Sequence, residues 1–463
     1  MRLYSTTFPL SFCFWCTAPA CPQALAILIH NPNCRQGLPI HVGVPSRPIP
    51  APIRCGGGVP WADEAGLDLT SFPISEIVLA ILYAIRQGGE SMAKILVTCA
   101  RSPAAVHLGR LLHESGHSVM LADTKRLHLG RWRSWPDKCL RHPSPRHQPQ
   151  RFAEWLQHVV KTEAIDCVIP VYEETFHHGL NHGTLDCEHF CSDIETLDRL
   201  HNKFEFIQFA KSCGIEVPET IMVEHIDEIK SKLTSNHILK PVYSRFGENV
   251  ILKPNPSKLN IKVNKTNPWV LQQRLDGKQY CLQGICKNGK VLSSVAYSSD
   301  FTVSKTSVFF EKTGKGDLGG IIEKIASNCN YTGFLSFDVI LGEDGIARPI
   351  ECNPRATSAL HLYAIQDKID DAILNGNTVQ CTGVSRRLVL PMWFNLLANL
   401  FKKNHVREWR KARKRSTSVE WNVFDPRPGV LQLISLVGFA AVALRNRTSL
   451  IAATTHEFEW NGK

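Results

Sequence analysis

The sequence has no hydrophobic run long enough to cross a membrane. The nearest candidates are residues 74–85, which Glu76 interrupts, and residues 429–444, and both fall short of the roughly 18 uncharged residues that a spanning helix needs. Apolar residues make up 43% of the chain and charged residues 21%. These values are close to globular averages, so they argue against a wholly disordered, collagenous or coiled-coil chain. The short apolar runs argue against an integral membrane protein.

The cysteines lack the arrangement of a disulfide framework. Sixteen are scattered along the chain, and several, such as Cys99 and Cys167, lie inside apolar segments. Buried thiols of this kind are typical of a reducing compartment, so we predict a cytoplasmic protein. Cys13 and Cys16 have the spacing of half a zinc site, but no second pair follows, and the segment 187–191 (Cys-Glu-His-Phe-Cys) is no stronger.

Positive charge is concentrated in two segments. The net charge of +11 belongs to the chain after residue 91, because residues 1–91 contain five basic and five acidic side chains. Residues 125–151 and residues 402–415 each carry eight basic side chains and one acidic one. Such clusters bind phosphate, nucleic acid or anionic lipid, although a solvated surface is the commoner role.

The first 91 residues are rich in Pro, Gly and Cys and show little periodicity. This composition predicts an irregular N-terminal extension that need not be part of the functional protein. Met92 is followed at once by a strand pattern (Ala-Lys-Ile-Leu-Val), so we expect the functional start there.

Strand and helix patterns alternate after Met92, as in a parallel sheet. Ser102 and Pro103 are typical of the start of a helix. Glu173 and Glu174 directly follow an apolar strand, at the sheet edge where open α/β sheets bind ligands. A GxGxxG fingerprint is missing, so we do not predict nicotinamide or flavin binding. The predicted elements are strands at 94–99, 118–122 and 166–171 and a helix at 106–113.

The next part of the chain places lysines beside a loop. One helix is predicted over 197–213, with Lys203 inside it, and it ends at Gly214. A strand at 237–240 ends in Lys240 and leads into the loop 242–249. A lysine next to a flexible loop suits phosphate, because backbone N–H groups approach the oxygens while the ammonium supplies charge.

Antiparallel hairpins follow, and the last of them carries the most informative residues. Asn288-Gly289 predicts a turn between strands at 280–285 and 290–296. Two further strands within 333–355 place Asp338 and Glu351 close together, with Asn353 on the same face as Glu351.

This hairpin offers oxygen ligands and a guanidinium. Two carboxylates and an amide oxygen suit Mg²⁺ that bridges nucleotide phosphates, while the alternative is an exposed polar face of the hairpin. Arg355, after Pro354, can reach a substrate carboxylate or a developing oxyanion.

The order of these motifs resembles the ATP-grasp superfamily, in particular its carbamoyl-phosphate synthase-like and carboxylate-amine ligase members. The resemblance runs from about Lys94 to Ile365, and its most specific part is the last hairpin. It rests on Asn202-Lys203 with 214–218, on Leu239-Lys240-Pro241, on 270–280, and on Phe337-Asp338 with 350–355.

The resemblance implies an α/β fold in three parts. A parallel-sheet pre-ATP-grasp domain is expected at 92–195, an ATP-grasp domain of α+β type with antiparallel sheets at 196–370, and a partly helical C-terminal tail at 371–463. Its activity would be that of a ligase: ATP phosphorylates a carboxylate, and an amine or similar nucleophile attacks the acyl phosphate.

The resemblance also implies residue roles. Lys203 and Lys240 would contact ATP phosphates, and Arg355, with Lys240, would serve the acyl transfer. Magnesium, as one or two ions for which Mn²⁺ can substitute, would be held by Asp338, Glu351 and Asn353, with Glu351 bridging. The remaining nucleotide contacts would be the phosphate loop residues Ser244, Arg245 and Gly247, the adenine hinge Gln272, Gln273, Arg274 and Leu275, and Gln279 in the ribose position.

Two departures from the family pattern stand out. The phosphate loop has one glycine where several are usual, and Gln279 replaces a glutamate found in many relatives. An amide still accepts a ribose hydroxyl hydrogen bond, so we expect weaker nucleotide binding rather than none.

Several alternatives stay open. Acceptor specificity is expected around Arg101, Glu173 and Glu174, but neither the carboxylate nor the amine can be identified. A carbamoyl phosphate synthase is disfavoured because the chain has one ATP-grasp unit where the large synthase subunit has two. The rival class is a non-catalytic nucleotide-binding or scaffold protein whose basic clusters contact RNA or anionic membrane.

The C-terminal tail raises the question of membrane contact. Leu431, Leu433, Ile434, Val437 and Ala441 share one face of a predicted helix, which either packs on the protein or lies on a membrane surface. Packing is the commoner answer, and peripheral membrane contact stays a hypothesis. Nucleic acid is not an expected partner, and no oligomeric state is predicted.

Overall fold

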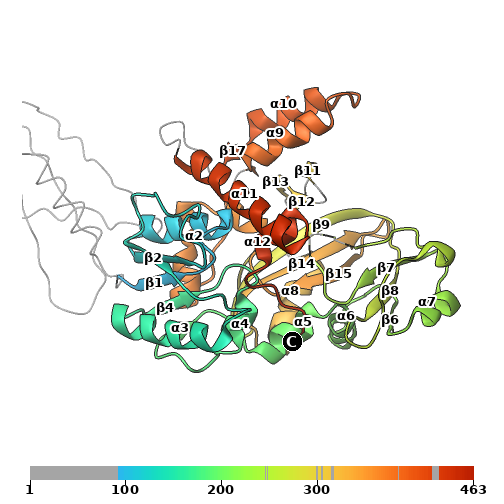
Figure 1. Ribbon diagram of the computed structural model, residues 1–463, viewed down its shortest axis with the longest axis horizontal. Coiled ribbons are helices and arrows are strands. Elements are labelled where there is room, and N and C mark those ends of the chain that lie inside the picture. The colour runs from blue at the N-terminus through green and yellow to red at the C-terminus, as the bar shows by residue number, and fades with distance from the viewer. Residues whose placement is uncertain are drawn as a thin grey trace, which may run out of the picture. The chain divides into compact units, whose positions relative to one another are not determined.

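The fold is described from a computed structural model (Figure 1). The described residues are 92–245, 247, 249–298, 301–303, 306–313, 318–383, 385–419 and 427–462. The predictions for residues 1–91 lie outside them.

The first part is a five-stranded sheet in the order β3-β2-β1-β4-β5, with every neighbouring pair parallel. It confirms the predicted parallel sheet. Ser102 caps the first helix by accepting a hydrogen bond from the Ala104 N–H, with Pro103 as the first helical residue. The elements are β1 (Lys94–Val97), α2 (Pro103–Glu114), β2 (Ser118–Asp123), β3 (Lys138–Arg141), α3 (Pro149–Glu163), β4 (Cys167–Ile169), α4 (Thr175–Gly179) and β5 (Glu188–His189).

The predicted single helix over 197–213 is wrong, because the structure has two helices, α5 (Ile194–His201) and α6 (Lys203–Ser212). Asn202 separates them with an extended backbone, φ −64° and ψ 111°, and its side chain accepts hydrogen bonds from the next two free N–H groups of α6. The break makes Lys203 the first residue of a helix.

A small antiparallel sheet follows, in the order β6-β8-β7. Its buried face is built from Val223, Leu239 and Leu271, packed on Ile229 of the adjoining helix. The elements are β6 (Thr220–Val223), α7 (Ile226–Lys232), β7 (His237–Pro241) and β8 (Trp269–Gln273). The connection from β7 to β8 contains the short 3-10 helix η2 (Pro256–Lys258).

The largest sheet has the order β15-β14-β9-β10-β13-β16-β17 and is antiparallel except for its last pair. Its first four strands confirm the predicted hairpins, and Asn288 and Gly289 have positive φ, as the tight turn requires. The elements are β9 (Lys278–Lys287), β10 (Lys290–Ser298), β11 (Thr302–Val303), β12 (Thr306–Ser307), β13 (Phe309–Lys312), η3 (Leu318–Gly320), α8 (Ile321–Asn328), β14 (Gly333–Leu341), β15 (Ala347–Asn353), η4 (Ser358–Leu362), η5 (Ile365–Asp367), η6 (Asp371–Asn375), β16 (Arg386–Arg387) and β17 (Thr417–Ser418).

One apolar core joins the parallel sheet to this large sheet. It contains Ile95 and Leu108 from the first sheet and its helix, and Ile285, Phe334 and Tyr363 from the second part, all of them buried. Burial of apolar area is the dominant favourable term in folding, so the two parts stabilise each other.

Four helices lie in the described part of the chain after residue 388, and none of the described helices is long and apolar enough to cross a membrane. The predicted helix from 429 is present. On the face proposed for packing, Leu433 and Val437 are 55% and 72% exposed, while Ile434 is partly buried. The helices are α9 (Val389–Ala398), α10 (His405–Arg415), α11 (Arg427–Asn446) and α12 (Leu450–Thr455).

Candidate functional site

Two carboxyl groups lie side by side where β14 meets β15. Asp338 pairs with Glu351 in the antiparallel register, next to a bulge, and the two side chains are hydrogen bonded. Burial, followed by the charge of Glu351, raises the pKa of Asp338 well above its usual range. Two neighbouring carboxyls in a poorly solvated place cannot both ionise without compensating charge, so this pair is ready to exchange a proton for a cation.

Two buried lysines face the carboxyl pair. The Lys203 ammonium lies 3.5 Å from a Glu351 oxygen and donates to the Ser244 carbonyl at 3.1 Å. Lys240 donates to the Ile350 carbonyl at 3.0 Å. Burial would raise the pKa of the Glu351 carboxyl, but the charges of Lys203 and Lys240 lower it instead.

The pKa of Lys240 itself is lowered to about 8, chiefly by burial, although Glu351 attracts the charged form. A buried ammonium with few hydrogen-bond partners lowers the stability of the folded protein, because it has lost its contacts with water. A bound anion next to it offsets this loss.

Arg355 lies buried at the end of the same hairpin. Its guanidinium lies 4.2 Å from the centre of the Tyr172 ring, 3.6 Å from a Glu173 oxygen and 3.4 Å from the Asn353 side-chain oxygen. Its Nε atom is buried without a hydrogen-bond partner among the described residues. The group is fixed in place and still has a donor to offer, as binding of an anionic oxygen requires.

Glu173 connects two arginines. Its side chain is fully buried and pairs with Arg245 as well as with Arg355. Glu173 follows β4 and thus ties the loop after β7 to the edge of the parallel sheet; that this edge binds a ligand stays a prediction.

The C-terminal segment reaches this loop as well, which the sequence did not indicate. Arg245 donates to the Asn461 side-chain oxygen at 2.9 Å and to the Trp460 carbonyl. The Trp460 indole N–H donates to Asp198 at 2.7 Å. Residues more than two hundred positions away in the chain therefore hold the predicted phosphate loop.

The predicted adenine hinge lies at the end of β8. The Gln272 side chain is buried and donates to the Thr220 hydroxyl at 3.1 Å. The N–H groups of Gln273 and Arg274 each donate to a backbone carbonyl of a flanking segment at 2.7 Å. These two N–H groups are therefore already hydrogen bonded within the protein. Leu275 is half-buried.

The remaining predicted nucleotide contacts are dispersed. Gln279 is exposed on β9, in register with Ile340. In the loop after β7, the Ser244 carbonyl contacts Lys203, and Gly247 has φ +65°. Phe246 and Glu248, which belong to the same predicted loop, lie outside the described residues.

Two residues expected near the acceptor substrate form contacts within the first sheet instead. Arg101 forms a buried ion pair with Asp123 at 2.5 Å and stacks on Phe458. Glu174 accepts hydrogen bonds from the Thr98 hydroxyl and from the N–H groups of residues 171 and 172. Both therefore hold the first sheet together, and of the three predicted residues Glu173 is the one that contacts the cluster around Arg355.

The chain resembles a known protein family and several solved structures. Residues 200–359 match the ATP-grasp domain family. The chain is similar to the solved structure of N5-carboxyaminoimidazole synthetase from Staphylococcus aureus complexed with ADP, at 14% identity and a TM-score of 0.53, over 67% of this chain and 86% of that chain.

Two other solved structures show the same likeness. L-amino acid ligase from Bacillus licheniformis is 13% identical with a TM-score of 0.50, over 62% of this chain and 75% of that one. Phosphoribosylamine–glycine ligase from Thermotoga maritima is 13% identical with a TM-score of 0.50, over 63% and 79%. The chain shares the fold of these solved structures, and its residues 200–359 are the part that matches the ATP-grasp domain family.

Proposed function

We propose that the protein is a ligase that uses Mg²⁺ and ATP to activate a carboxylate as an acyl phosphate, which an amine or similar nucleophile then attacks. The observation that carries this proposal is the convergence of Lys203 and Lys240 on the carboxyl pair Asp338 and Glu351. Two buried cations opposite two carboxyls form the charge pattern that a metal-bound triphosphate complements.

The donor set fits magnesium. Asp338, Glu351 and Asn353 supply hard oxygen ligands from adjacent strands. Burial and the neighbouring Glu351 raise the pKa of Asp338, which supports a site that a cation would stabilise. Bound there as one or two ions, with Mn²⁺ as a substitute, the metal would neutralise charge on the transferred phosphoryl group. Lys203 and Lys240 would hold the phosphates, and the hinge at Gln272–Leu275 would contact adenine.

Arg355 is proposed as the catalytic residue for acyl transfer. Its planar guanidinium, held by Tyr172 and Glu173, can donate two parallel hydrogen bonds to a carboxylate or to the oxyanion that forms from it. Because Glu173 lies in the first domain, we propose that residues 92–195 contribute to the acceptor site and residues 196–370 bind the nucleotide. Residues 371–463 form the partly helical C-terminal region, which adds β16 and β17 to the large sheet and brings Trp460 to the phosphate loop.

The proposal is tested by measuring ADP release with a panel of carboxylates and amines, in the wild type and in Glu351→Gln. The substitution keeps the shape and removes a charge, so we expect release to fall by at least about 100-fold with the fold intact. Glu343→Gln, in the exposed turn of the same hairpin, is the matched control and should keep full activity. ADP release that persists at the normal rate in Glu351→Gln refutes the site assignment.

A specific observation also favours contact between the C-terminal tail and an anionic membrane surface. Helices α9 and α10 lie side by side (Figure 1), and α9 and the turn after it expose large apolar side chains, including Phe401 at 99%. A groove of about 950 Å³ beside them is lined mainly by arginine and lysine. Exposed aromatic and aliphatic residues next to basic ones are typical of peripheral membrane binding. The exposed residues are Trp393, Phe394, Leu397, Leu400 and Phe401.

This second proposal is tested by co-sedimentation with phosphatidylserine-containing vesicles at low salt. Leu397→Glu and Phe401→Glu should each weaken binding several-fold, because they place a carboxylate where lipid would lie. Leu252→Glu, at an equally exposed leucine elsewhere, should not. Binding to RNA in place of vesicles, insensitive to the apolar substitutions, contradicts the membrane proposal and favours the scaffold class.

A further inference from the structure

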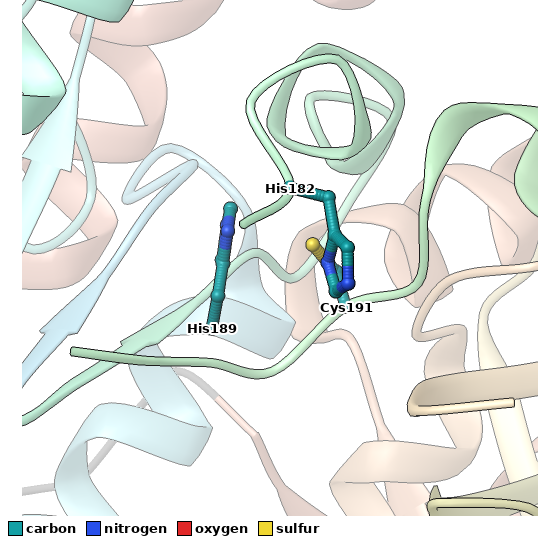
Figure 2. Close-up of side chains that lie close together, drawn as sticks. All are labelled: His182, His189 and Cys191. Atoms are coloured by element: carbon teal, nitrogen blue, oxygen red, sulfur yellow. The ribbon is translucent and has the colours of Figure 1, made fainter. Parts of the chain in front are cut away.

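Three potential metal ligands meet in the connection between α4 and α5, apart from the proposed ligase site. One ligating atom from each of His182, His189 and Cys191 lies within 4.8 Å of the others (Figure 2). His182 comes from the turn after α4. His189 is the last residue of β5, and Cys191 follows two positions later in a bend, where its N–H donates to the His189 carbonyl at 2.8 Å. Cys191 is buried, His189 partly buried and His182 exposed.

A chain of hydrogen bonds sets the protonation of His189. The Thr98 hydroxyl donates to Glu174 at 2.8 Å, and since it has one proton, it can only accept from His178 Nε2, which is 3.4 Å away. The Nδ1 atom of His178 is then the unprotonated nitrogen, and it lies 2.9 Å from His189 Nε2. His189 must therefore donate through Nε2 and keep an unprotonated Nδ1.

That Nδ1 atom is buried and has no hydrogen-bond partner among the described residues. A histidine that donates one ring N–H to a fixed partner and presents the other nitrogen as a lone pair has the arrangement found around bound metals.

We propose that His182, His189 through Nδ1, and Cys191 through Sγ bind a zinc ion whose fourth position is open to solvent. Two imidazoles and a thiolate suit a borderline ion such as Zn²⁺ better than the hard ions that oxygen ligands select. On binding, the Cys191 thiol loses its proton to water and forms the Zn–S bond. Tetrahedral ligands stand roughly 3.3–3.8 Å apart, so the cluster must contract, which the exposed His182 side chain can do by rotating.

The position of the cluster gives the ion a structural consequence. Phe190, between His189 and Cys191, packs edge to face on Phe334 of β14, with ring centres 5.4 Å apart. Zinc bound there would therefore stabilise β5, the edge strand of the parallel sheet, next to its contact with the large sheet. This inference does not depend on the proposed ligase activity.

The test uses the full chain with Zn²⁺ and Co²⁺ as probes. Competition with a chromophoric chelator should show one zinc equivalent more in the wild type than in His182→Ala or Cys191→Ser, and the cobalt complex should show a thiolate charge-transfer band that Cys191→Ser abolishes. Cys187→Ser and His225→Ala, a cysteine and a histidine outside the cluster, are matched controls that should keep both signals.

The decisive variant is His182→Ala, because His182 is exposed and its replacement does not disturb the core. Replacing the buried Cys191 can disturb the core. Equal zinc content in the wild type and in His182→Ala, with no cobalt–thiolate band in the wild type, overturns the assignment. Zinc bound by cysteines elsewhere in the chain gives that same equality and counts against the site.

Discussion

Lys240 is held charged in a place that disfavours charge, and this predicts how stability changes with pH. Its pKa is about 8 in the folded protein, against 10.5 for the free side chain. The difference corresponds to about 3 kcal/mol of cost for the ammonium below pH 8. Between the two pKa values the unfolded chain binds more protons, so the cost is relieved and stability rises as pH increases from 8 towards 10.5.

The perturbation that reveals this contribution is Lys240→Met, which has no charge to bury. From pH 7.5 to 9.5, the free energy of unfolding of the wild type should rise by about 2 kcal/mol relative to the variant. Urea denaturation at the two pH values measures this change in the free energy of unfolding. The variant also lacks the hydrogen bond to the Ile350 carbonyl, but that loss is the same at both pH values and does not affect the change. Lys290→Met, at an exposed lysine, is the control and should follow the wild type. Identical pH dependence in wild type and Lys240→Met refutes the reasoning.

Three further predictions concern the same hairpin and its supports. Arg355→Lys should lower ligase turnover by at least about 100-fold with an unchanged melting temperature, because a lysine cannot reproduce the planar donor pair; full turnover in a steady-state assay contradicts the assigned role. Glu173→Gln should destabilise the protein by about 3 kcal/mol in urea unfolding, since it leaves the Arg245 and Arg355 charges buried without their partner; a change below about 0.5 kcal/mol counts against that pairing. Gly284→Ala should lower the melting temperature, because a Cβ there would lie 2.5 Å from the Ile322 side chain. An unchanged melting temperature in calorimetry would show that Ile322 moves aside without cost.

Local sequence determined the parts of the site that depend on neighbouring residues. Asp338 and Glu351 belong to one hairpin with a short turn, so strand alternation alone predicts that they pair. Arg355 follows on the same segment. Lys240 was predicted to end a strand, and it is the last residue but one of β7, which runs to Pro241.

Tertiary contacts account for what sequence could not predict. The break at Asn202 depends on one extended backbone angle within an otherwise helical pattern, and it orients Lys203. The arrival of Trp460 and Asn461 at Arg245 joins segments more than two hundred residues apart, and no periodicity reports such a contact. Arg101 was assigned to the acceptor from its position, but its ion pair with Asp123 gives it a structural role.

The central claim is that Asp338, Glu351, Lys203 and Lys240 form a magnesium-dependent ATP site. Calorimetric titration of the full chain with ATP, with and without Mg²⁺, in the wild type and in Glu351→Gln, tests it most directly. We predict that magnesium strengthens ATP binding to the wild type and that Glu351→Gln abolishes this strengthening. A folded wild type that does not bind ATP, or a variant whose binding responds to magnesium as the wild type does, contradicts the account.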